Sequence, residues 1–165
     1  MFYDWVVGKQ DQKKDGDSLI TENRKARFRY QVLETLEAGI VLEGWEVKSL
    51  REGGVNLSDS YAVVNGDQVF LLNLHISPYA KARMIPGIET RSRKLLLHRK
   101  EINSLIGQVK EKGRTLIPLK MYWNKDGRAK VLVGICIGKQ AHDKRQDIKK
   151  REDDRYLKRV QKQYR

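Results

Sequence analysis

The chain has 165 residues, and its 34 Lys and Arg against 21 Asp and Glu give a net charge of +13. A basic excess of this size favours a polyanionic partner, a nucleic acid or an anionic membrane, because a surface that serves only solubility usually mixes the two signs evenly. No run reaches the ~20 apolar residues of a membrane span, and the single cysteine excludes a disulfide within the chain and a Cys-rich zinc site. We therefore expect one cytoplasmic domain with extensions.

The N-terminal part predicts a leader followed by a strand. Residues 8–22 are polar and without hydrophobic periodicity, so we expect residues 1–22 to be a disordered leader. From Arg27 apolar residues alternate, with a break at Glu34, which predicts a strand. Its apolar face consists of Phe28, Tyr30, Val32 and Leu36.

The next segment predicts a short helix and a hairpin. After a turn at Gly39, Val47 and Leu50 lie three residues apart, which indicates about two helical turns. Residues 60–76 form the clearest hairpin pattern, because Asn65-Gly66 readily takes the positive φ angles that a tight turn requires.

A polar stretch at 77–92 interrupts the pattern with Pro78 and Pro86, and a second helix follows it. Apolar residues at i, i+3, i+4 and i+7 predict one buried face on this helix, which ends near Gly113. The face comprises Ile102, Leu105, Ile106 and Val109.

A second hairpin predicts the rest of the core and places Cys136 in a buried strand. In the first strand the alternate residues Ile117, Leu119, Met121 and Trp123 share one face. After the turn at 124–127, the second strand is expected to place Ala129, Val131, Val133, Ile135 and Ile137 on the same face. With about six strands and two short helices, we expect a mainly β fold over residues 23–137, a small closed OB-type β-barrel with a nucleic-acid face.

Residue patterns for catalysis or metal binding are weak. His75, His98 and His142 stand at no metal-ligand spacing. The segment GICIGKQ has too few residues between its glycines for a phosphate loop, and it lacks the hydroxyl that reaches magnesium. We therefore expect no metal, no cofactor and no enzymatic activity, with an RNA-processing enzyme as the alternative.

Two basic segments of the barrel predict nucleic-acid binding. Residues 23–30 interleave four basic residues with two aromatic ones, which combines phosphate contact with base stacking. Residues 91–100 add six basic side chains, counting His98. The candidate contacts in these segments are Arg24, Lys25, Arg27, Arg91, Arg93 and Lys94.

Residues 138–165 form a basic tail that holds eleven Lys or Arg and five Asp or Glu. The pairs Asp147–Arg151 and Asp154–Lys158 have the i, i+4 spacing of a helix, but the apolar stripe is too thin to anchor that helix on a barrel. Because an isolated helix of this length is marginal in water, we expect a tail that is disordered alone and helical on a polyanion.

Several segments closely resemble the SsrA-binding protein family (SmpB). They are ENRKARFRY, EAGIVLEGWEVKSLREGGVNLSDSYA, NLHISPY, RSRKLLLHRKEI and GKQAHDKR, in this order. We expect the protein to be a monomer. The resemblance implies an OB-type barrel that holds the tRNA-like domain of transfer-messenger RNA, and a role in rescuing stalled ribosomes. It also implies elongation factor Tu, with the alanyl-charged RNA, as a partner.

The resemblance also assigns individual residues. It places Asn23 and Glu37 on the RNA-binding side of the barrel, with Leu96 supporting that surface. The tail is implied to enter the decoding centre and the empty message channel of the ribosome, through Gly138, Lys139, His142, Asp143, Lys144 and Arg145. We expect Lys149 and Arg151 of the tail to contact the ribosome as well. A general binder of structured RNA, or a ribosome-assembly protein, is the alternative.

Overall fold

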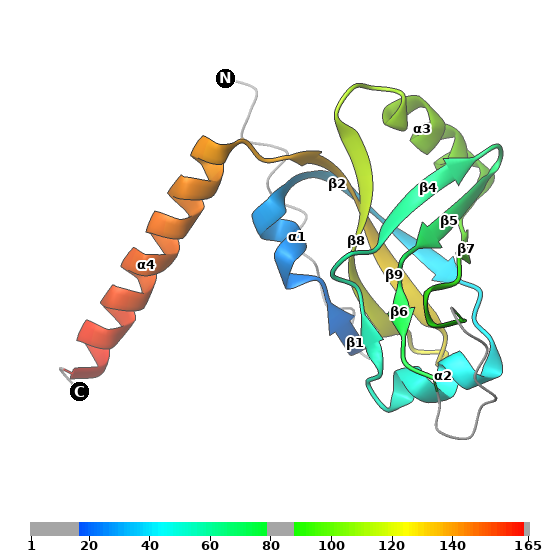
Figure 1. The fold of residues 1–165 in the computed structure, drawn as a ribbon, viewed down its shortest axis with the longest axis horizontal. Helices are drawn as coiled ribbons and strands as arrows, with labels where there is room; N and C mark the ends of the chain where they lie inside the picture. The colour runs from blue at the N-terminus through cyan, green and yellow to red at the C-terminus, as the bar shows by residue number, and fades with distance from the viewer. Residues whose placement is uncertain (1–16, 79–87, 164–165) are drawn as a thin grey trace.

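The computed structural model describes residues 17–78 and 88–163. Figure 1 shows a body of strands and short helices, from which one long helix, α4 (Ala141–Gln163), projects to one side. A large sheet holds β1 (Ser18–Glu22), β2 (Tyr30–Ile40), β4 (Tyr61–Asn65), β5 (Gln68–Leu72), β7 (Arg93–Leu96), β8 (Arg114–Trp123) and β9 (Ala129–Gly138). The other elements are α1 (Arg24–Arg29), α2 (Gly44–Arg51), β3 (Val55–Asn56), β6 (His75–Ile76), a 3₁₀ turn (Ile88–Thr90) and α3 (Arg99–Val109).

Six strands of the sheet form a ring. Antiparallel pairing runs in the order β8, β4, β5, β7, β2, β9, and β9 pairs again with β8. The main core lies inside this ring and is built from buried aliphatic residues such as Leu71, Leu95, Met121 and Val131. The prediction of a mainly β fold with about six strands and short helices is confirmed.

Both predicted helices and both predicted hairpins are present. Helix α2 spans Gly44–Arg51, and α3 buries Ile102 and Leu105 against the core. In the first hairpin the turn residues are Gly66 and Asp67, and Gly66 takes the positive φ, so the turn lies one residue later than predicted. Cys136 is buried in β9 as predicted, and burial raises the pKa of its thiol to about 11.

The predicted leader is wrong for its last residues. Ser18–Glu22 form β1, which pairs antiparallel with β8, and Ile20 packs against the core. An apolar pair as short as Leu19-Ile20 shows no periodicity, so the strand is visible only through its partner. Residues 1–16 lie outside the described part of the chain.

The strand predicted from Arg27 begins later, because residues 24–29 form α1. Asn23 caps this helix, since its side-chain oxygen accepts a hydrogen bond from the backbone N–H of Ala26. The break predicted at Glu34 is confirmed as a register shift in β2 between Val32 and Glu34.

A β-bulge changes the predicted face of β8. Pro118 pairs with Val133 and Lys120 with Leu132, so Leu119 is an extra residue in the strand. Leu116 and Met121 consequently face the main core, whereas Ile117 and Leu119 pack with Ala26 and Cys136 in a second cluster beneath α1. The predicted single face for Ile117, Leu119 and Met121 is therefore wrong.

A buried ion cluster joins α2 to the strand β7. Glu46 is fully buried and contacts Arg93, also fully buried, with 2.7 Å between Arg93 Nε and Glu46 Oε1. Arg91 reaches the same carboxylate, with 3.0 Å between its Nε and Oε1. Burial lowers the pKa of Arg93, and Glu46 opposes this effect.

We expect Arg93→Met to lower the free energy of unfolding by about 3–5 kcal/mol, because removing one partner of a buried pair leaves the other charge inadequately compensated. Chemical denaturation measures this decrease. Lys94→Met on the same strand is the matched control, since Lys94 points to the other side of the sheet. Equal decreases for the two variants would show that the cluster does not stabilise the fold.

Candidate nucleic-acid interface

Helix α1 presents the first group of predicted contacts. Arg24, Lys25 and Arg27 are exposed on this six-residue helix. Asn23 itself is buried, and its amide nitrogen donates hydrogen bonds to the carbonyls of Leu57, at 3.2 Å, and Pro118, at 3.1 Å. Because both N–H groups of this amide serve the fold, Asn23 holds α1 against β8 and positions the basic side chains.

A groove of about 680 Å³ contains the second group. Glu37 of β2 accepts a hydrogen bond from the hydroxyl of Tyr122, and its other oxygen lies 3.9 Å from Lys130 Nζ. Leu96 of β7 lines the same groove and is 52% exposed. A Cβ atom added at Gly39 would lie 3.2 Å from Leu96 Cβ, so this glycine lets the two strands approach closely.

The groove brings together charged and apolar groups that suit contact with a base or a sugar. Carboxylate oxygens of Glu37 accept hydrogen bonds, and Lys130 with Arg128 supplies positive charge for phosphate. The sequence prediction missed Arg128, Lys130 and Trp123, which come from the second hairpin. The cations that flank its turn, in KDGRAK, were the available signal.

The second basic segment divides between the core and the surface. Arg93 is buried and Arg91 is mostly buried, and both bind Glu46. Their prediction as nucleic-acid contacts is not supported by this placement, because their guanidinium groups neutralise an internal carboxylate. Lys94, which follows Arg93, is partly exposed on the opposite side of β7.

The two candidate surfaces lie at opposite ends of β2. Tyr30, next to α1, pairs with Gly138, whereas Gly39 pairs with Leu96 beside the groove. Seven residues of strand separate Tyr30 from Glu37, which corresponds to roughly 23 Å. A single ligand that contacts both surfaces must therefore be large.

The tail forms helix α4 and is docked on α1. The backbone N–H of Lys139 donates to the carbonyl of Arg29 at 2.9 Å, and its ammonium group donates to the carbonyl of Arg27 and to Asp147. The guanidinium carbon of Arg151 lies 5.5 Å from the centre of the Phe28 ring.

The expectation of a tail that is disordered alone is therefore not met, since residues 141–163 are helical. Nucleation is the costly step of helix formation, and the contacts of Lys139 and Arg151 with α1 fix the first turns. These contacts join residues more than a hundred positions apart, so the pattern of the tail by itself does not reveal them.

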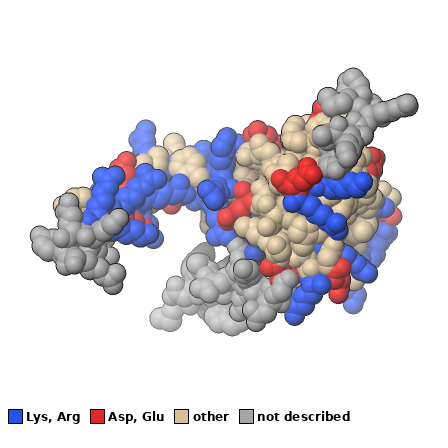
Figure 2. All heavy atoms as spheres, turned by 90° about the horizontal axis from the view of Figure 1, so that it is seen from below, with Lys and Arg blue, Asp and Glu red and all other residues tan. Residues whose placement is uncertain are grey.

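Beyond its docked turns, α4 carries its charge into solvent. Figure 2 shows Lys and Arg gathered along the helix, whereas the visible face of the body mixes both signs. Arg155, Lys158 and Arg159 lie in the turns beyond Arg151, and all three are exposed.

The other predicted tail residues lie at the base of this helix. Gly138 ends β9, and His142 and Asp143 are exposed in the first turn, 3.9 Å apart between Nδ1 and Oδ1. Arg145 and Lys149 are exposed on the helix surface.

The described part of the chain contains no group of three His, Cys, Asp or Glu side chains arranged to hold a metal ion. Within residues 17–78 and 88–163, no helix is both long and apolar enough to cross a membrane. The chemical groups that the structure does bring together are cations, hydrogen-bond acceptors and aromatic rings.

Comparisons with known proteins place these surfaces in context. The family model described as SmpB protein matches residues 20–163. The chain is 54% identical to an SsrA-binding protein of Gloeothece citriformis, over 88% of this chain and 94% of that protein. It is 50% identical to an SsrA-binding protein of Enterococcus faecalis, over 89% of this chain and 95% of that protein.

A solved structure is also similar, with a TM-score of 0.62 and 50% identity over 73% of this chain and 85% of that one. It is described as "tmRNA-SmpB: a journey to the center of the bacterial ribosome". The likeness therefore extends from sequence to fold.

The docking of α4 predicts a pH effect at Asp147. The hydrogen bond from Lys139 lowers the pKa of Asp147 below its ordinary value of 3.8. A lowered pKa means that the contact is complete above this ordinary value and disappears as the pH falls through the lowered one. We expect Lys139→Met to raise the pKa of Asp147, as measured by NMR titration of its carboxyl carbon.

Lys149→Met, a charge removal on the same helix, is the matched control and should leave the pKa of Asp147 nearly unchanged. An equal response to both substitutions would mean that general charge, and not the Lys139 contact, determines this pKa.

Proposed function

The chain belongs to the SmpB family, and from this premise we propose that it binds transfer-messenger RNA and delivers it to stalled ribosomes for trans-translation in the cytoplasm. The single observation that carries the proposal is the division of the molecule into a folded body and a projecting basic helix (Figure 1). A body that grips one RNA and a helix that enters another site are what this role requires.

In this proposal the ring of strands is an OB-type barrel, a fold that binds nucleic acids on its surface. It holds the tRNA-like domain of transfer-messenger RNA. Arg24, Lys25 and Arg27 contact phosphates, and Glu37 and Leu96 meet the RNA at the groove. Lys94, two residues before Leu96 on β7, contacts the RNA beside the groove. Asn23 acts through α1, which it positions. The distance between α1 and the groove suits a ligand as large as a folded RNA domain.

Helix α4 is the part that enters the decoding centre and the empty message channel. Nine Lys and Arg against five Asp and Glu in residues 141–163 favour ribosomal RNA as its partner. His142, exposed in the first turn, offers a ring for stacking on a base. Gly138 and Lys139 set where the helix starts, and Asp143, Lys144, Arg145, Lys149 and Arg151 supply its contacts.

The chain acts as a monomer and without catalysis in this proposal. Elongation factor Tu is a further partner, which joins through the alanyl-charged RNA. General binding of structured RNA, or a role in ribosome assembly, is the second candidate. Comparing the affinity for transfer-messenger RNA with the affinity for bulk tRNA separates the two candidates.

The phosphate contacts of α1 predict a change in salt dependence. We expect Arg24→Ala with Arg27→Ala to weaken RNA binding and to reduce the slope of log K against log salt by roughly one unit for each arginine replaced, since every neutralised phosphate releases ~0.7 to 0.9 counterions. Fluorescence anisotropy over a salt series measures the slope. Lys125→Ala, in the exposed turn of the second hairpin, is the control for removal of net charge alone.

An unchanged slope in the double variant would show that α1 does not contact the phosphates of the RNA. A similar decrease in the Lys125 variant would assign the effect to the total charge of the protein.

The division into body and helix predicts the behaviour of a chain that ends at Gly138. Every described strand and the whole core lie before this point, so the shortened chain should fold and keep most of its affinity for transfer-messenger RNA. It should fail to support peptide tagging in reconstituted translation of a message without a stop codon, because nothing occupies the decoding centre.

Asp143→Ala with Lys144→Ala and Arg145→Ala should show the same separation in milder form. Normal peptide tagging by the shortened chain would show that α4 is not needed for tagging and serves only solubility. Loss of RNA binding by the folded, shortened chain would instead show that the body alone does not grip the RNA.

A further inference from the structure

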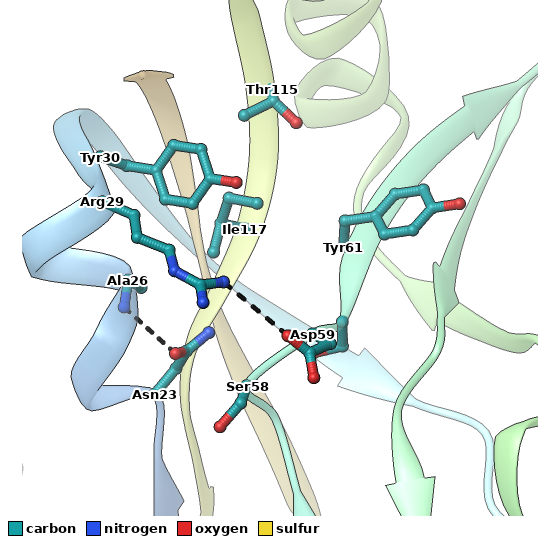
Figure 3. Close-up of a pocket in the computed structure, with 10 residues that line it drawn as sticks. Asn23, Ala26, Arg29, Tyr30, Ser58, Asp59, Tyr61, Thr115 and Ile117 are labelled. Atoms are coloured by element: carbon teal, nitrogen blue, oxygen red, sulfur yellow. Dashed lines mark hydrogen bonds and ion pairs between the residues drawn. The ribbon is translucent and has the colours of Figure 1, made fainter. Parts of the chain in front are cut away.

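A pocket beside the first candidate surface lies between α1 and the loop that precedes β4. It has a volume of about 220 Å³. Figure 3 shows Tyr30 and Ile117 on one side and Asp59 with Tyr61 on the other, while the side chain of Arg29 reaches between them. The pocket therefore draws on α1, β2, β4 and β8, which are far apart in sequence.

The inner surface of the pocket is apolar and aromatic. Ala26 and Ile117 are buried beneath it in the second hydrophobic cluster. Tyr30 is partly buried, and Tyr61 is 39% exposed, so part of its ring is accessible to a ligand. Rings of this kind provide stacking surfaces for a flat heterocycle.

The rim of the pocket is polar and incompletely paired. Among the described residues, the hydroxyl groups of Tyr30, Ser58 and Thr115 have no hydrogen-bond partner, although all three line the pocket. Asp59, with a side chain that is 79% exposed, adds a carboxylate at the mouth. These groups offer hydrogen bonds to whatever occupies the space.

The ion pair at the mouth is easily opened. Arg29 Nη1 lies 3.7 Å from Asp59 Oδ1, and the Arg29 side chain is 47% exposed. Exposed pairs at this distance contribute little to stability, so each partner is available to a ligand. Opening the pair presents a cation for a phosphate and an anion for a donor group on the same ligand.

We propose that this pocket binds one unpaired guanine nucleotide of an RNA strand. The base lies against Tyr61 and the apolar floor, and Asp59 accepts hydrogen bonds from the N1–H and N2–H₂ groups on its Watson–Crick edge. Arg29 leaves Asp59 to bind the adjacent phosphate, next to the cations of α1. Adenine, which lacks the N1–H donor, is the poorer ligand because it places an acceptor opposite the carboxylate.

This proposal rests on the proposed RNA-binding function, and its test keeps the two apart. The full-length chain is titrated by fluorescence anisotropy with the single-stranded pentamers UUGUU and UUAUU. We expect UUGUU to bind about tenfold more tightly, a difference of ~1.4 kcal/mol. Affinity for transfer-messenger RNA, measured on the same sample, reports the proposed function independently.

Two substitutions with matched controls locate the site. Tyr61→Ser should weaken UUGUU binding about tenfold, whereas Tyr156→Ser, which alters an exposed tyrosine of α4, should not. Asp59→Asn should abolish the preference for UUGUU over UUAUU, whereas Asp153→Asn on α4 should preserve it. Asp59 is exposed in a loop, so this variant remains informative if Tyr61→Ser lowers stability.

Equal affinity for the two pentamers, or no binding of either, overturns the proposal, even where the affinity for transfer-messenger RNA is high. A guanine preference that survives Asp59→Asn also overturns it, because the preference then arises elsewhere. Absence of transfer-messenger RNA binding by the unaltered chain would contradict the proposed function itself.

Discussion

The double pairing of β9, with β2 on one side and β8 on the other, is the interaction on which the rest of the structure depends. It closes the ring around the main core. It also places Gly138, where the strand ends, opposite Tyr30, where α1 ends. Helix α4 consequently starts beside α1, and the contacts of Lys139 with Arg27 and Arg29 become possible.

Arginine residues serve opposite purposes in this molecule according to the carboxylates nearby. Arg93 is held inside by Glu46, a residue 47 positions earlier in the chain, and contributes to the join between α2 and β7. Arg24 has an equally basic side chain but stands on an exposed helix. The net charge that suggests a polyanionic partner therefore overstates the number of cations that such a partner meets.

Local patterns predicted most of the fold, and long-range contacts account for what they missed. The hairpins, α2 and α3 follow from turn residues and from periodicity within one segment. Strand β1, the bulge at Leu119 and the burial of Arg93 depend on partners far away in sequence, which periodicity does not reveal. The family resemblance identified the candidate residues Glu37 and Leu96. The ion pair of Glu37 with Lys130 could not be predicted in the same way, because it depends on the register of β2 against β9.

The docking of α4 through its N-terminal half, at Lys139 and Arg151, makes the rest of the helix a lever. A helix of 23 residues extends about 34 Å, so a rotation of roughly 10° at Lys139 moves its far end by about 6 Å. A displacement of that size equals about one nucleotide of an extended strand. The direction of the distal turns is therefore decided by the few contacts that Lys139 and Arg151 make with α1.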